Sequence, residues 1–212
     1  MIEAVIFDMD GVLIDSEPLY CELREQYLAS FGIRLTRDQA DRFMGQRFLV
    51  ALDEIFPQLP PDLRAAIEQD FVPWDIALQS VFRQEAREAI IALKKQGVRI
   101  AIASNSVPYK IENLIEQCGL QGMVDTWVSG AELERCKPAP DIYLKTAAQL
   151  GLSPRACAAV EDSDCGLEAA CAAGCYTFCL VDRRFAFEQQ QAHRWIDSLH
   201  QLPQAVSALN QP

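Results

Sequence analysis

The chain has 212 residues, of which 50% are apolar and 23% are charged, so it can bury a sizeable core as one domain or as one domain with a small insert. Its formal net charge of -11 disfavours nucleic acid as a partner, because affinity for phosphate backbones comes from Lys and Arg. We therefore expect a globular protein that handles small molecules.

No segment of the chain resembles a signal peptide or a membrane span. The N-terminus enters an apolar run without a basic flank, and the longest apolar-rich stretch, Ala169 to Val181, is interrupted by Gly174, Tyr176 and Thr177. The eight cysteines lie in apolar patterns without C-x-x-C pairs, which favours reduced core thiols over disulfides or a zinc site. We expect a cytoplasmic protein with no membrane partner. The oligomeric state is not specified, and a monomer is compatible with the sequence.

The first part of the chain predicts one strand followed by helices. Residues 4–7 form an apolar run that predicts a buried strand. Helices are expected over residues 17–31, after the Thr36 capping box, over 48–56, from Pro61 onward and roughly over 74–82. No strand is expected between Glu17 and Arg83. This change of pattern predicts an inserted helical cap over residues 17–83.

From residue 84 onward, strand and helix patterns alternate. Strands are expected over 98–103, 126–128, 156–160, 176–181 and 195–196, and helices over 85–95, 109–118, 141–150, 166–173 and 202–209. Strands that alternate with helices of this length predict parallel pairing and right-handed crossovers. The expected fold is α/β: a doubly wound parallel sheet from residues 1–16 and 84–212, with a small inserted α-helical cap domain.

Four short polar sequences stand at comparable positions in this pattern. They are Asp8 to Asp10 after the first strand, Ser104-Asn105 after the second, Lys137-Pro138 before a helix, and Glu161-Asp162 after the fourth strand. Each could by itself be a turn or a helix cap. In a parallel sheet, however, all four can face one crevice at the carboxyl ends of the strands, which predicts a single site.

These residue types suit phosphoryl transfer, which needs positioned charge more than elaborate covalent machinery. Asp8 is the candidate nucleophile, because a carboxylate can accept a phosphoryl group and divide the transfer into two steps. Asp10 is the candidate general acid and later the base that activates water. Ser104 and Lys137 would bind the transferring phosphate, with Asn105 as a further substrate-binding candidate.

The carboxylates also predict a Mg²⁺ site. Asp8 and Asp162 supply hard oxygen ligands of the kind that Mg²⁺ prefers. Glu161 would either bind the ion directly or hydrogen-bond to the groups that bind it. Asp10 completes the set of candidate metal ligands.

The four sequences resemble the motifs of the haloacid dehalogenase-like hydrolase superfamily. Residues 8–16 resemble its first motif, Ser104-Asn105 the second, residues 137–143 the third and residues 161–166 the fourth. The resemblance covers the whole chain and is strongest to the β-phosphoglucomutase-like phosphatases. It implies a Rossmann-like core, a helical cap inserted after the first motif, Mg²⁺ dependence and an aspartyl-phosphate intermediate.

Within this superfamily several reactions have to be weighed. Asp10 argues against a dehalogenase, and the absence of Lys from Met1 to Leu93 argues against a phosphonatase. β-Phosphoglucomutases carry a His where this chain has Tyr20, and a cap Lys and Arg where it has Met44 and Phe48. A phosphatase, a phosphoric monoester hydrolase, is therefore expected. One alternative is a phosphomutase. The other is a non-catalytic phosphometabolite-binding module, which is disfavoured because every residue required for turnover is present.

The cap is expected to select the substrate. Residues 43–48 stand where related caps place a substrate loop, in which Gly45 would allow close approach. Arg47 would bind a hydroxyl, a carboxylate or a second phosphate of the leaving group, the alternative being a solvated surface Arg. The expected partner is a small phosphorylated metabolite, namely a sugar, polyol or sugar-acid phosphate.

Overall fold

Six parallel strands form one sheet in the part of the chain that the computed structural model describes, which is residues 1–211 without 44–45, 47, 73, 75–76 and 185–190. The strands lie in the order β3-β2-β1-β4-β5-β6. Their bounds are β1 Ala4–Phe7, β2 Arg99–Ser104, β3 Thr126–Ser129, β4 Cys157–Glu161, β5 Tyr176–Leu180 and β6 Arg194–Ile196. The predicted parallel sheet is thereby confirmed.

Strand β1 lies inside the sheet, with β2 and β3 on one side of it and β4, β5 and β6 on the other. It pairs with β2 on one side and with β4 on the other, so that Phe7 lies opposite both Ile102 and Val160. The order of the strands along the chain therefore reverses at β1. In open α/β sheets such a reversal leaves a crevice outside the carboxyl ends of the strands. Asp8, the residue after β1, stands at this crevice.

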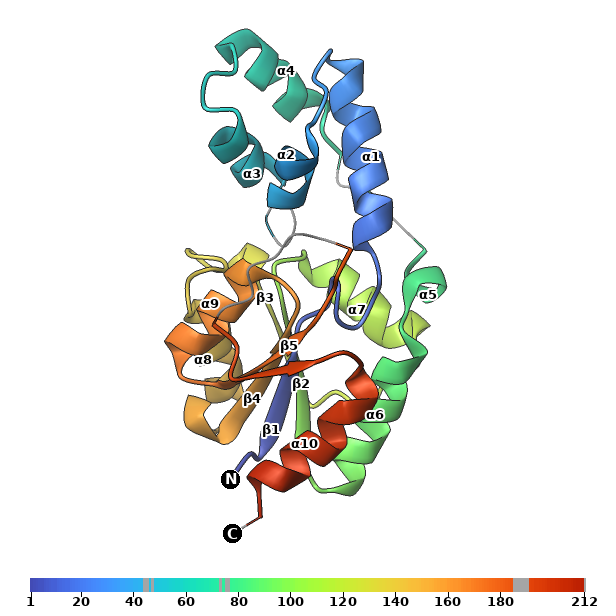
Figure 1. Ribbon diagram of the computed structural model, residues 1–212, viewed down its shortest axis with the longest axis vertical. Coiled ribbons are helices and arrows are strands. Elements are labelled where there is room, and N and C mark those ends of the chain that lie inside the picture. Colours follow the sequence, from blue (N-terminus) through green and yellow to red (C-terminus); the bar gives the residue numbers. More distant parts are fainter. Residues whose placement is uncertain (44–45, 47, 73, 75–76, 185–190, 212) are drawn as a thin grey trace.

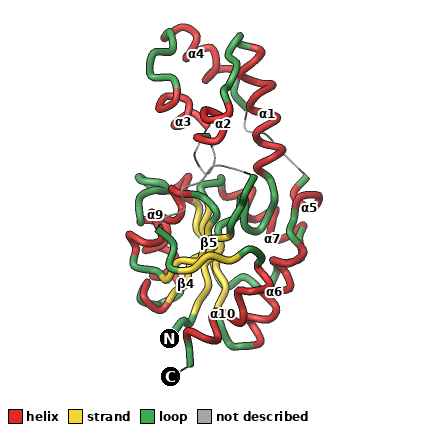
Figure 2. Tube along the Cα trace, viewed as in Figure 1, coloured by secondary structure: helices red, strands yellow, loops and turns green. Residues whose placement is uncertain are grey.

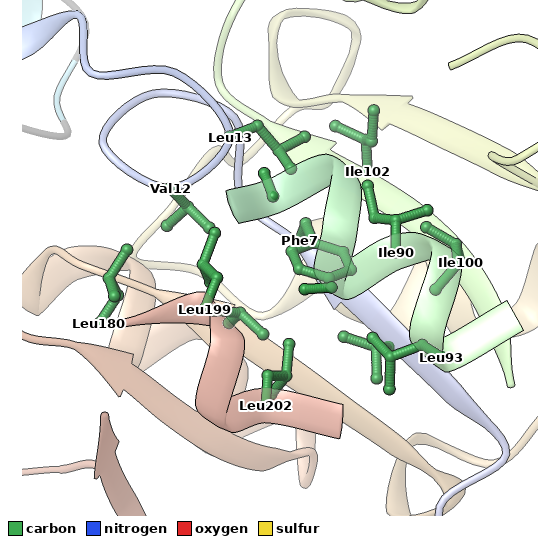
Figure 3. Close-up of a cluster of buried hydrophobic side chains, with 14 of the residues drawn as sticks. Phe7, Val12, Leu13, Ile90, Leu93, Ile100, Ile102, Leu180, Leu199 and Leu202 are labelled. Carbon is green, nitrogen blue, oxygen red and sulfur yellow. The ribbon is translucent and has the colours of Figure 1, made fainter. Parts of the chain in front are cut away.

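Helices cover both faces of the sheet (Figure 1). Their bounds are α6 Gln84–Lys95, α7 Pro108–Gln117, α8 Asp141–Gln149, α9 Asp164–Ala173 and α10 Leu202–Leu209. Side chains alternate across a strand, so Val5 and Phe7 pack with α6, α7 and α10, whereas Ala4 and Ile6 pack with α8 and α9. Figure 3 shows Phe7, Ile100 and Ile102 of the sheet facing Ile90 and Leu93 of α6.

Four helices lie beyond the carboxyl edge of the sheet, away from both chain ends (Figures 1 and 2). They are α1 Glu17–Ser30, α2 Arg37–Arg42, α3 Phe48–Ile55 and α4 Pro61–Asp70. This helical lobe has a core of its own, in which Leu28, Phe43, Leu52 and Ile67 are fully buried. The capping box at Thr36 is present, with Thr36 Oγ1 accepting from Gln39 N at 3.3 Å.

The chain enters and leaves the helical lobe at one place. Asp15 N donates to Val81 O at 2.7 Å, and Arg83 N donates to Leu13 O at 2.9 Å, so the two connections run side by side as a short antiparallel bridge. The fifth expected helix is shorter than the sequence predicts: α5 spans Leu78–Val81 and packs against α7 of the sheet layer rather than within the lobe.

All eight cysteines are free thiols. Among the described residues, no helix combines the length and the apolar character needed to cross a bilayer.

Candidate active site

The four polar sequences meet at the carboxyl edge of the sheet. Ser104 is the last residue of β2, Glu161 is the last residue of β4, and Asp8 follows β1 between them. Lys137 comes from the loop that precedes α8. A cavity of about 350 Å³ opens between this edge and the helical lobe, and its lining includes Asp8, Asp10, Ser104, Asn105 and Lys137. The cavity has the size of a small-molecule site, for which the usual range is about 300–1,000 Å³.

Lys137 connects the carboxylates at the base of the cavity. Its Nζ donates to Asp8 Oδ1 at 2.5 Å, to Glu161 Oε1 at 2.6 Å and to the carbonyl oxygen of Ala103 at 2.8 Å. Asp8, Lys137 and Glu161 are all buried. The three donors of the ammonium group are therefore all used within the chain, and they hold the Asp8 carboxylate in one place at the end of β1.

Asp8, Glu161 and Asp162 form the acidic cluster that could hold a metal ion, because one oxygen from each lies within 4.8 Å of the others. Glu161 Oε2 is buried and has no hydrogen-bond partner among the described residues. Lys137 forms ion pairs with two of these three carboxyl groups, and with all three ionised its single positive charge would leave two negative charges to be balanced. A divalent cation with a preference for carboxylate oxygen, such as Mg²⁺, fits this arrangement.

The pKa values of the acidic cluster also favour a bound cation. Burial raises the pKa of Asp8 to about 8, against the opposing effect of Lys137, and the neighbouring Glu161 and Asp10 raise it further. Burial, together with Asp8 and Glu161, raises the pKa of Asp162 well above its usual value. A positive charge placed among these groups would stabilise their ionised forms, which a nucleophilic carboxylate requires.

Asp10 lies at the same cavity but in different surroundings. Its Oδ1 accepts from Ser16 Oγ at 2.8 Å and its Oδ2 accepts from Ser106 Oγ at 2.9 Å. Asp10 does not belong to the acidic cluster found among the described residues. A half-buried carboxyl group held by two hydroxyls at the cavity wall suits proton transfer. Ser16 lies within the first motif, but the sequence does not reveal that it and Ser106 orient Asp10.

Ser104 and Asn105 also organise the loops around them. Ser104 Oγ accepts from Ser106 N at 3.0 Å, and Asn105 Oδ1 accepts from Lys137 N at 3.3 Å. A Cβ atom at Gly130 would lie 2.5 Å from Asn105 Oδ1, so this glycine leaves the space that the amide group occupies. Asn105 thus joins the second motif to the third, and it lines the cavity.

Two glycines of the predicted motifs make room for the acidic cluster. Gly11 has φ +82°, and a Cβ atom there would lie 1.9 Å from Asp162 Oδ2. At Gly166, in the first turn of α9, a Cβ atom would lie 2.1 Å from Glu161 Oε2. Both carboxylates therefore pack directly against main chain. Tyr143 is the last residue of the third motif, but the sequence assigned it no role; its hydroxyl donates to Glu161 Oε1.

Not every expected site residue can be placed. Gly45 and Arg47 lie outside the described residues, so their roles at the substrate stay predictions. Gln46, between them, lines the cavity. The expected part of Asp10 in metal binding also stays a prediction.

Comparison with known proteins identifies the family. The sequence model of the haloacid dehalogenase-like hydrolases matches residues 2–174. The chain belongs to this family. The expectation of a phosphoric monoester hydrolase from the β-phosphoglucomutase-like group is confirmed with it.

The chain resembles phosphatases of this family over most of its length. It is 34% identical to hexitol phosphatase B of Escherichia coli strain K12 over 177 residues, which cover 80% of this chain and 79% of that protein. It is 32% identical to the phosphorylated carbohydrates phosphatase of Thermotoga maritima over 81% of this chain and 82% of the relative. Among solved structures, CbbY from Rhodobacter sphaeroides in complex with xylulose-(1,5)bisphosphate superimposes with a TM-score of 0.75 at 25% identity, over 95% of this chain and 96% of the other.

Proposed function

We propose that this protein is a Mg²⁺-dependent phosphatase that hydrolyses a small phosphorylated metabolite through an aspartyl-phosphate on Asp8. The observation that carries the proposal is the position of Asp8. Its carboxylate is held by Lys137 at the base of a metabolite-sized cavity and belongs to an acidic cluster suited to a divalent cation. The carboxyl group of Asp10, which accepts hydrogen bonds from two hydroxyls, lines the same cavity. The phosphatase names of the relatives support the same reaction.

Asp8, Glu161 and Asp162 would hold the Mg²⁺ ion, because their oxygens already lie together. When bound, the ion supplies positive charge that offsets the carboxylates and the phosphate. Lys137 adds a fixed positive charge beside the attacking oxygen. The backbone and the hydroxyl of Ser104, at the end of β2, would bind the remaining phosphoryl oxygens.

The reaction takes place in two steps at the carboxyl edge of the sheet. In the first, a carboxylate oxygen of Asp8 attacks phosphorus while the Asp10 carboxyl group donates its proton to the departing oxygen of the substrate. In the second, the Asp10 carboxylate takes a proton from water, which attacks the phosphorus and releases Asp8 and inorganic phosphate. Ser16 and Ser106 keep Asp10 oriented in both steps.

The helical lobe is proposed to act as the cap. It supplies one wall of the cavity, including Tyr20, Phe48 and Phe71, and the chain enters and leaves it at a single bridge, which suits opening and closing as one unit. Closure would exclude bulk water from the phosphoryl group. The relatives are named for hexitol and carbohydrate phosphates, which supports a sugar, polyol or sugar-acid phosphate as the substrate class. Location in the cytoplasm stays a prediction.

A purified-enzyme screen tests the function. Hexitol phosphates, fructose 1-phosphate, aldose phosphates and sugar-acid phosphates are incubated with Mg²⁺ or with EDTA, and both inorganic phosphate and isomerised product are measured. Mg²⁺-dependent phosphate release is expected. Isomerisation without release would instead support a phosphomutase, and turnover of no compound would favour a non-catalytic binding module.

The role of Asp8 is tested separately. Asp8→Asn should lower kcat by about 10³-fold or more, because an amide is a poor nucleophile. Asp38→Asn, at an exposed position of α2, serves as the matched control and should leave kcat unchanged. Mass spectrometry of acid-quenched wild type should find phosphate on the peptide that carries Asp8. A variant with near-normal kcat would remove Asp8 from the role of nucleophile.

A further inference from the structure

The two oxygens of the Glu161 carboxyl group have different surroundings. Oε1 accepts from Lys137 Nζ at 2.6 Å and also from the hydroxyl of Tyr143, so both of its lone pairs are engaged. Oε2 is buried and accepts from none of the described residues. The residue as a whole is 0% exposed. A buried carboxylate oxygen without a partner costs free energy, and therefore requires an explanation.

The main chain beside Oε2 does not supply the missing partner. A Cβ atom at Gly166 would lie 2.1 Å from Oε2, so the first turn of α9 packs directly against this oxygen. The N–H group of Gly166 is already used, because it donates to Ser163 Oγ at 3.2 Å. The neighbours of Glu161 in the acidic cluster are Asp8 and Asp162, which supply further oxygens. Oε2 is therefore the oxygen of Glu161 that remains for a cation.

Tyr143 contacts Glu161 from α8, among the apolar side chains that pack between this helix and the sheet. It is fully buried, and its ring centroid lies 5.3 Å from Lys137 Nζ. Burying a hydroxyl costs free energy unless it forms a hydrogen bond, and a Phe ring would fill the same space without that cost. The feature that distinguishes Tyr143 from a Phe is thus its hydrogen bond to Glu161.

A second donor on Oε1 fixes the orientation of the carboxyl group. The last torsion angle of a Glu side chain is soft, so one hydrogen bond leaves the plane of the carboxylate free to tilt. Lys137 is held in turn by Asp8 and by the carbonyl oxygen of Ala103, and it approaches Oε1 from the third motif. Tyr143 approaches the same oxygen from α8. Two donors from separate elements define the carboxylate plane, and with it the direction of Oε2.

We propose that Tyr143 is a positioning residue for the metal ion: with Lys137 it holds Glu161 Oε1, and it thereby directs Oε2 to Mg²⁺ as a direct ligand. The inference rests on the proposed Mg²⁺ site and adds to it a residue from outside the acidic cluster. Tyr143 acts through Glu161 and takes no part in the chemical step. Residues that orient a metal ligand in this way typically change metal affinity by about 10- to 100-fold.

Tyr143→Phe tests the inference, because it removes the hydroxyl and keeps the ring beside Lys137. Lys137 still bonds Glu161 Oε1 in this variant, so the fold should be retained, which circular dichroism checks. Mg²⁺ and Ca²⁺ are titrated separately into metal-free protein at one pH. The Kd of each ion is measured by isothermal calorimetry and, independently, from the rise of Tm with metal concentration. Tyr109→Phe, at an exposed position of α7, is the matched control.

The Kd for Mg²⁺ should rise about 10- to 100-fold in Tyr143→Phe and stay within about twofold of wild type in Tyr109→Phe. The Kd for Ca²⁺ should rise by a smaller factor in Tyr143→Phe. Mg²⁺ demands a near-ideal octahedral arrangement of ligands, whereas Ca²⁺ accepts flexible ones, so a tilted carboxylate penalises Mg²⁺ more. A general loosening of the fold would not produce this change in the preference between the two ions.

The outcomes separate this inference from the proposed function. A Kd for Mg²⁺ within about twofold of wild type in Tyr143→Phe would overturn the inference and leave the Mg²⁺ site standing. Equal losses for Mg²⁺ and Ca²⁺ would also overturn it, because the whole cluster, and not the direction of one oxygen, would then have changed. A wild type that binds no Mg²⁺ would overturn the proposed site and the inference together, whereas the screen for phosphate release tests the phosphatase function by itself.

Discussion

Replacement of Lys137 by Met should destabilise the metal-free protein, and the loss should grow with pH. The ammonium group is the single cation bonded to both Asp8 and Glu161 among the described residues, and its side chain is 3% exposed. Met fills a similar volume but leaves the buried carboxylates without their counter-charge. Breaking a buried ion pair by removing one partner costs about 3–5 kcal/mol. For a chain of 212 residues this corresponds to a fall in Tm of roughly 6–20 °C.

The direction of the pH dependence follows from the pKa values. In the folded protein burial raises the pKa of Asp8 to about 8 and that of Asp162 well above 3.8, so the folded state binds more protons than the unfolded state between about pH 4 and pH 8. Stability therefore falls as pH rises through this window. Without Lys137 the carboxyl pKa values rise further, because the charge that opposes burial is gone. The difference between the variant and wild type should therefore be smallest at low pH, where Asp8 is protonated in both proteins, and should grow above about pH 8, where Asp8 of the wild type ionises.

Thermal unfolding followed by circular dichroism in EDTA, between pH 6 and pH 9.5, measures the effect. Lys145→Met, at an exposed position of α8, controls for the loss of a lysine and should stay within about 0.5 kcal/mol of wild type. Equal losses at pH 6 and pH 9.5, or a loss below about 1 kcal/mol at pH 9.5, would refute the assignment of Lys137 as the counter-charge of a buried acidic cluster.

Three further predictions concern the same site. Mg²⁺ should raise Tm relative to EDTA, and by more at pH 8 than at pH 5.5, because protons compete with the cation for Asp8 and Asp162. Calorimetric scans at both pH values test this, and equal Tm shifts would argue against carboxylate ligands. Gly166→Ala should lower the free energy of unfolding by about 1–3 kcal/mol in chemical denaturation, because the added Cβ atom would overlap Glu161. The same change in an exposed helix raises protein stability, so a stabilised variant would contradict this packing. Asp10→Asn should lower kcat by about 10²- to 10⁴-fold with Tm almost unchanged, and a kcat within twofold of wild type would exclude proton transfer by Asp10.

Much of the architecture is encoded locally in the sequence. The run of Ala4 to Phe7 is apolar at every position because β1 is buried on both faces, and such a run can be recognised without knowing its neighbours. The capping box at Thr36 and the glycines that end helices are equally local signals. Because parallel strands end at the same edge, the order of the elements was enough to bring Asp8, Ser104 and Glu161 to one crevice.

The different roles proposed for these residues depend on contacts between distant parts of the chain. Lys137 and Asp8 are separated by 129 residues, and no local pattern shows that the ammonium group spans Asp8 and Glu161. Ser106, 96 residues from Asp10, holds that carboxyl group away from the acidic cluster. The small size required at Gly166 becomes apparent only when the Glu161 side chain is seen against it.

The sequence by itself determined the family and the parallel sheet, and it singled out the carboxylates that are proposed to react, because each of these depends on hydrophobic periodicity and on short motifs at strand ends. Tertiary structure alone brings the oxygens of Asp8, Glu161 and Asp162 together and gives Asp10 its two hydroxyl donors, which is why the proposed metal site and proton-transfer group could not be told apart from the sequence. The physical reason is that charge, burial and hydrogen bonding act through space. Side chains far apart in the chain acquire their roles only when the fold brings them together and removes the water between them.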